Sequence, residues 1–146
     1  TAVAVGEGVT MYCCSDNVTE AQREGFVSLL HCSGLLEELD EKLMDVGSAV
    51  AGCGGAFACL FLEGLADGAV YAGLPRAKAQ RYAAQMLLGI AKLALASDEH
   101  TGALKDAVCS PGGTTIAGVR ALEERGFRAA AMNAVIAAYE RTKELG

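Results

Sequence analysis

The sequence "SPGGTT", Ser110 to Thr115, lies between two stretches with helical patterning. Proline and glycine interrupt regular structure, so the stretch predicts a connection between two helices, with a threonine as N-cap of the second. The same residues could bind a ligand. Backbone N–H groups at a helix start attract an anion, glycines let it approach the main chain, and threonine hydroxyls donate hydrogen bonds. Turn chemistry alone explains the residues as well, so the pattern leaves both interpretations open.

Helical patterns extend in both directions from this stretch. Before it, Pro75 follows Gly73 at a predicted helix N1 position, and that helix continues to about Ala96. Its apolar stripe has spacings of three and four residues: Tyr82, Met86, Ile90 and Leu93. A short helix over 102–108 leads into the connection. Two further helices follow it, over 115–124 and 127–145, and Gly126 separates them. The fold class is therefore mainly α.

A long helix is also predicted over 42–66, and its section Val46–Leu62 contains no charged residue. This section is near the lower length limit for a membrane span. Its small residues, including those of "AGCGGAF" (Ala51–Phe57), favour close helix crossings over contact with lipid or ligand. We expect a helix buried against other helices, and no membrane partner.

The first forty residues have a different pattern. Residues 8–14 are typical of a strand, residues 35–39 of a second short strand, and the segment between them of a helix. Asn17 or Thr19 can cap that helix and Gly34 can end it. This strand–helix–strand unit is too small for a sheet domain, so we interpret it as the end of one.

Composition limits the function classes. The chain has 146 residues, a net charge of −6, 52% hydrophobic residues, no Trp and two Pro. The abundance of small residues favours packed helices over a β-sandwich, and the negative charge argues against a nucleic-acid partner. Neither His31 nor His100 has a metal-ligand spacing to a cysteine, so no metal site is predicted, and surface roles are expected for both. The cysteines are typical of small buried side chains in a reducing, cytoplasmic environment: Cys13, Cys14, Cys32, Cys53, Cys59 and Cys109.

Charge patterning leaves a second pair of alternatives. Arg76, Lys78 and Arg81 occupy the first turns of the Pro75 helix, where the helix dipole disfavours bases. They form either a solvated basic face or a set of partners for the acidic "EELDE" (37–41) across an interface. Glu63 and Asp67 lie one turn apart and are explained as an exposed acidic edge.

The segment "ALKDAVCSPGGTTIAGVRALEERGFRAAAMNAV" (Ala103–Val135) closely resembles the signature region of the pyrroline-5-carboxylate reductases. The resemblance extends to "EKLMD" (41–45), "LADG" (65–68), "GLPR" (73–76), "LLGIAKLAL" (87–95) and, at the other end, "VGEGVTMY" (5–12). It covers almost the whole chain. One departure stands out, because the family usually has Ser-Gly-Ser-Gly-Pro-Ala-Tyr where this chain has residues 51–57.

This resemblance implies a helical-bundle dimerisation domain of the 6-phosphogluconate-dehydrogenase C-terminal type, preceded by a short α/β remnant of a Rossmann domain. The implied boundaries are 1–40 for the remnant and 41–146 for the dimerisation and substrate-binding domain. It implies a homodimer with interlocked helices, and five such dimers can form a decamer. The glycine-rich turn for NADPH or NADH lies outside these residues, so the cofactor-binding residues stay unknown and the chain alone is expected to be inactive.

The implied reaction reduces 1-pyrroline-5-carboxylate to L-proline, with NADPH or NADH as the hydride source. The residues that match the family's substrate loop are Ser110, Gly112, Gly113, Thr114 and Thr115. Thr115 matches the residue proposed to hydrogen-bond the ring nitrogen, which makes it the candidate catalytic residue. The alternative is a stand-alone helical oligomerisation module. The helical domain of a 6-phosphogluconate-type dehydrogenase is ranked lower, because its substrate loop would lack this stretch.

Overall fold

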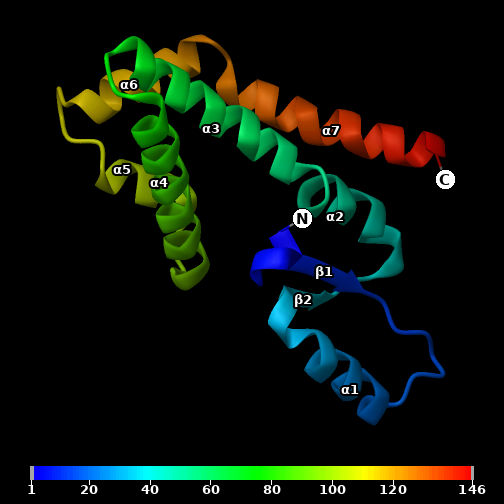
Figure 1. Cartoon of the computed structure of the whole chain (residues 1–146). Helices are drawn as coiled ribbons and strands as arrows, with labels where there is room; N and C mark the ends of the chain where they lie inside the picture. Colours follow the sequence, from blue (N-terminus) through cyan, green and yellow to red (C-terminus); the bar gives the residue numbers. More distant parts are fainter. Residues whose placement is uncertain (1, 146) are drawn as a thin grey trace. The chain divides into compact units, whose positions relative to one another are not determined.

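The computed structural model describes residues 2–145 and divides the chain into two compact units. The first unit comprises 1–55 and 134–146, and the second comprises 56–133. The elements, labelled in Figure 1, are two strands and seven α-helices among the described residues: β1 (Gly8–Tyr12), α1 (Glu20–Leu30), β2 (Gly34–Glu38), α2 (Met44–Ala51), α3 (Gly54–Tyr71), α4 (Arg76–Ala96), α5 (Thr101–Ala107), α6 (Thr114–Glu124) and α7 (Phe127–Leu145). The mainly helical class is confirmed.

The first unit contains the predicted strand–helix–strand motif. Strands β1 and β2 pair in parallel from Gly8↔Gly34 to Tyr12↔Glu38, and α1 forms the crossover that parallel strands require. Thr19, not Asn17, is the N-cap, and it forms a capping box with Gln22. The helix ends at Leu30, earlier than predicted, because a 3₁₀ turn over His31–Ser33 follows and Gly34 already begins β2.

Side-chain contacts stabilise this motif at two points. Tyr12 and Phe26 pack edge to face with ring centroids 5.3 Å apart, which joins β1 to α1. Arg23 of α1 donates to Glu38 of β2 over 2.8 Å, and its bonds to Glu20 and Glu38 raise its pKa above the usual range. Helix α2 lies close to β1, because a Cβ on Gly47 would stand 2.5 Å from the Met11 sulfur.

The predicted single helix over 42–66 is wrong in detail. A 3₁₀ turn over Glu41–Leu43 leads into α2, the helix breaks at Gly52 and Cys53, and α3 then continues to Tyr71. Glycines stabilise a helix poorly, so their cluster at 52–55 explains the break. The prediction of burial is also wrong for the single chain, since Val50 and Leu60 are 57% and 69% exposed.

In the second unit, α3 and α4 come together near the turn that joins them, and farther from the turn both line a groove. The buried apolar side chains of the described residues are all alanines: Ala49, Ala66, Ala79 and Ala83. Pro75 is the N-cap of α4, one position before the predicted N1, and Arg76 forms an ion pair with Asp67 of α3. Phe61 of α3 and Phe127 of α7 lie with ring centroids 5.3 Å apart.

Much apolar surface is left uncovered. The predicted stripe on α4 is 58%, 47%, 40% and 50% exposed at Tyr82, Met86, Ile90 and Leu93. Within the described residues, the helical stretch Glu41–Tyr71 is long and apolar enough to cross a membrane by length and composition, with a hydropathy of 1.7. Core helices of water-soluble proteins meet the same measure. Only 11% of its most apolar 18-residue segment is buried in the single chain, which leaves a large apolar surface exposed.

Candidate functional site

The SPGGTT stretch forms a tight turn between α5 and α6. The Gly113 N–H donates to the Ser110 carbonyl over 3.0 Å, with Pro111 and Gly112 at the centre of the turn. Gly112 has a φ of +68°, which a side chain would disfavour, and this Pro-Gly combination suits a type II turn. The plain turn chemistry of the sequence is therefore present, and it sets where α6 begins.

The N-terminus of α6 has no side-chain cap. Gly113 is the N-cap, so the prediction of a threonine cap is wrong. Thr114 and Thr115 instead occupy the first two helical positions, where backbone N–H groups have no partner within the helix. The helix dipole adds positive charge at the same point. This end of α6 therefore presents N–H groups and two hydroxyls together, which suits a small anion.

Ser110 and Gly113 are in close contact across the turn. A Cβ on Gly113 would lie 2.5 Å from the Ser110 hydroxyl oxygen and 3.1 Å from its carbonyl oxygen. Any side chain here would displace the hydroxyl from its place beside the helix start. The structure thus groups all five predicted site residues at one turn, and Ser110, Gly112, Thr114 and Thr115 are exposed.

A groove of about 640 Å³ runs beside this turn between α5 and α6. Gly112, Gly113 and Ile116 line it, but Ser110 and Thr115 do not. Lys105 is the cation on its α5 side, and Asp106 neutralises it over 2.6 Å. That hydrogen bond and the carboxylate's charge raise the pKa of Lys105. A lysine paired in this way is a weak attractor for a second anion.

The histidines have local structural roles. The His100 Nδ1 accepts the Gly102 N–H over 3.0 Å and caps α5, a more specific role than the surface role expected from the sequence. The His31 Nδ1 lies 2.7 Å from the Ser28 carbonyl oxygen at the end of α1. No group of His, Cys, Asp and Glu among residues 2–145 could hold a metal ion. The six cysteines are all free, but none is buried in the single chain, so the prediction of buried cysteines is wrong there.

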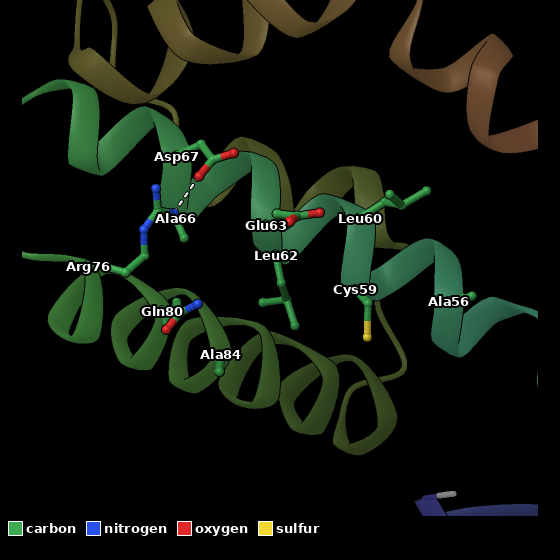
Figure 2. Close-up of a pocket in the computed structure, with 10 residues that line it drawn as sticks. All are labelled: Ala56, Cys59, Leu60, Leu62, Glu63, Ala66, Asp67, Arg76, Gln80 and Ala84. Carbon is green, nitrogen blue, oxygen red and sulfur yellow. Dashed lines mark hydrogen bonds and ion pairs between the residues drawn. The ribbon is translucent and has the colours of Figure 1, made fainter.

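A second groove, of about 1140 Å³, lies between α3 and α4 (Figure 2). Leu60, Leu62 and Ala66 provide apolar lining from α3, and Gln80 and Ala84 line the α4 side. The ion pair of Asp67 and Arg76 closes one end, as the dashed line in Figure 2 shows. Sequence patterning had grouped Arg76 with a basic face and Asp67 with an acidic edge. The hairpin turn between the two helices brings them together within one chain.

Comparisons with known proteins agree on one family. Residues 41–145 match the model for pyrroline-5-carboxylate reductase dimerisation. The pyrroline-5-carboxylate reductase of Synechocystis is 47% identical over the whole chain, and that of Arabidopsis thaliana is 44% identical over 99% of it. The chain covers 55% and 52% of these two relatives, so it spans about half the length of the curated relatives it matches.

Solved structures give the same result for the fold. The Plasmodium falciparum pyrroline carboxylate reductase with NADP bound superposes with a TM-score of 0.91 and 36% identity, covering 99% of this chain and 57% of that one. The Coxiella burnetii pyrroline-5-carboxylate reductase gives 0.93 and 31%, covering 100% and 54%. Since the family model spans both the SPGGTT turn and the uncovered helices, the chain belongs to the pyrroline-5-carboxylate reductase dimerisation family.

Proposed function

We propose that this chain is the dimerisation and substrate-binding part of a pyrroline-5-carboxylate reductase, which reduces 1-pyrroline-5-carboxylate to L-proline. The observation that carries the proposal is the uncapped N-terminus of α6, with Ser110 and Thr115 on either side of a glycine turn. The alternative of an inactive oligomerisation module leaves this arrangement of donors without a use.

The carboxylate of the substrate is assigned to the first turn of α6. Unpaired N–H groups and the helix dipole hold it there, and the Ser110 hydroxyl adds a hydrogen bond. The chain's charge of −6 repels an anion at long range, so binding depends on these local donors. Because the carboxylate has the same charge before and during the reaction, these contacts contribute mainly to binding.

The ring nitrogen is assigned to the Thr115 hydroxyl. Hydride addition converts C=N into CH–NH, so the nitrogen must also gain a proton. An alkyl hydroxyl is a poor acid, so Thr115 orients the ring by donating a hydrogen bond and relays a proton that comes from water. Holding the imine carbon in place beside the hydride donor is the larger contribution.

NADPH or NADH supplies the hydride when bound. The chain's own residues fit the substrate side of such a site, with donors for an anion and an orienting hydroxyl. None of its glycine clusters has the spacing of a dinucleotide-binding turn, so we assign no residue of this chain to the cofactor. We propose that the two-stranded sheet of β1 and β2 continues into the part of the protein that binds the cofactor.

The oligomeric state is proposed from the uncovered helices. The family match indicates oligomerisation, and a core of four alanines is too small to stabilise the helices alone. We propose a homodimer in which helices of a second copy, rather than lipid, cover this surface, and five dimers that assemble into a decamer. Six free cysteines suit a reducing, cytoplasmic environment.

Two substitutions in the gene's full-length product test the site. Thr115→Ala should lower kcat, and Ser110→Ala should mainly raise KM. Ser110→Ala loses a hydrogen bond to the carboxylate, and Thr115→Ala loses one to a nitrogen on which negative charge develops as hydride adds. Each loss should cost about 1.5–3 kcal/mol, or roughly ten- to a hundredfold. Steady-state kinetics with pyrroline-5-carboxylate measure both, and circular dichroism confirms folding. Near-normal kcat/KM in both folded variants would reduce the stretch to a plain turn.

Gly113→Val gives a stronger test, because its side chain would displace the Ser110 hydroxyl. Activity should fall further than in either hydroxyl variant. Gly118→Val in α6 is the matched control, since a Cβ there meets nothing within 4 Å. Equal losses in the two glycine variants would show that the effect is helix destabilisation and not loss of the site.

A further inference from the structure

The α3–α4 groove contains an acid without a counter-charge. Asp67 is neutralised by Arg76, but Glu63, one turn earlier on α3, has no ion pair or hydrogen bond with any residue in 2–145. Figure 2 shows Glu63 on α3 between Asp67 and Cys59, with no interaction drawn to it. Glu63 is exposed, so water solvates its carboxylate in the single chain.

That solvation would be lost if a second copy covered the groove. The lining is mostly apolar, with Leu60, Leu62, Ala66 and Ala84, as a surface for a packed helix requires. Removing a carboxylate from water costs several kcal/mol unless a cation pairs with it. An occupant that fits this groove must therefore bring an apolar face and a base.

The chain itself carries suitable bases. Within the second unit, Lys78, Arg81 and Arg125 form no ion pair with any described residue. Lys78 and Arg81 lie in the first two turns of α4, where the helix dipole makes an uncompensated base unfavourable. In this unit an unpaired acid and unpaired bases thus occur together without meeting in one copy.

In the proposed dimer, where a helix of the second copy would lie in the α3–α4 groove, we propose that Glu63 sets the docking register by pairing with Lys78, Arg81 or Arg125 of that copy. The inference rests on the proposed dimer and deepens it by naming the surface and the residue that selects the partner. In a two-fold dimer the pair occurs twice, because each copy contributes both the acid and the base. A misaligned or unrelated helix would bury the Glu63 carboxylate without a cation. Because such burial is unfavourable, the groove would select a correctly aligned second copy.

The test measures the dimer dissociation constant of the full-length product by sedimentation equilibrium. Glu63→Lys should raise it roughly tenfold or more, because it places like charges in the interface. Glu63→Gln should raise it less, and should reduce its dependence on salt concentration. Glu99→Lys, the same change at an exposed acid outside the groove, is the matched control and should have little effect.

Charge reversal then identifies the base. In the Glu63→Lys background, one of Lys78→Glu, Arg81→Glu and Arg125→Glu should restore most of the lost affinity, although each alone weakens the dimer or leaves it unchanged. Failure of all three to restore it overturns the pairing. If Glu63→Lys fails to fold, the salt dependence of Glu63→Gln decides: unchanged salt dependence overturns the proposal. A monomeric unaltered protein would instead overturn the proposed dimer itself.

Discussion

The two units are incomplete in different ways. In the first, a parallel pair of strands is joined by a crossover helix whose cap, ion pair and ring contact all lie within residues 8–38. In the second, the helices bury only alanines and leave Tyr82, Met86, Ile90 and Leu93 exposed. Apolar side chains are exposed in both units, since Leu29 and Leu35 of the first are 76% and 51% exposed, so the difference lies in the local contacts. These contacts hold the first motif together, whereas we propose that association with a second copy stabilises the second unit.

The largest effect is expected from a charged residue in the exposed apolar stripe of α4, because it tests whether a second copy covers the second unit. Ile90→Asp should raise the dimer dissociation constant roughly a hundredfold or more, since the proposed interface would bury an unpaired carboxylate. Sedimentation velocity measures the shift from dimer to monomer. Gln85→Asp, an exposed polar position on the same helix, should leave the dimer intact. Equal behaviour of the two variants would mean that the stripe is not covered by a second copy.

A larger side chain at the buried Ala66 tests how much packing within one chain stabilises the second unit. Ala66 is 1% exposed, so Ala66→Leu has no space and should lower the free energy of unfolding by about 1–3 kcal/mol. Thermal unfolding measures the loss. Ala77→Leu on exposed α4 surface is the control, and it should change stability little. A stable Ala66→Leu variant would show that α3 and α4 separate easily.

A smaller effect is expected in the first unit from the capping box. Thr19→Ala removes the hydroxyl that accepts the Gln22 N–H, and should cost about 1 kcal/mol. Amide hydrogen exchange should speed up in the first turn of α1 while α3 and α4 stay unchanged. Asn17→Ala is the control, because the structure assigns the cap to Thr19. Changed exchange throughout the helices would mean that the two units do not unfold separately.

The smallest effect concerns Asp40, between β2 and α2. Hydrogen bonds from the Lys42 side chain and from its backbone N–H lower the pKa of this carboxyl. A lowered folded-state pKa stabilises the fold above the ordinary aspartate pKa, and the contribution disappears as pH falls through the folded value. Carbon NMR titration should show Asp40 titrating low. In Lys42→Gln the pKa of Asp40 should rise part of the way toward the ordinary aspartate value. An unchanged pKa would show that the backbone N–H of residue 42 alone causes the shift.

Local chemistry explains which features could be predicted from the sequence. The strand–helix–strand order, the helix starts near Thr19 and Thr114, and the turn at 110–113 depend on residues close together in the chain, so their patterns were sufficient. The family resemblance added an assignment of roles to Ser110 and Thr115, and those roles stay predictions. The helix break at Gly52 and Cys53 was missed, because small residues suit a close helix crossing and a break equally well.

By itself, then, the sequence determined most of the local structure, the mainly helical class and the family. Tertiary structure alone decided that Arg76 pairs with Asp67 rather than with a distant acidic stretch, because a hairpin turn brings α3 and α4 together. It also decided that the apolar stripe of α4 stays uncovered in one chain. Periodicity shows which side chains need burial, but only the packing of helices in space shows whether the same chain provides the cover.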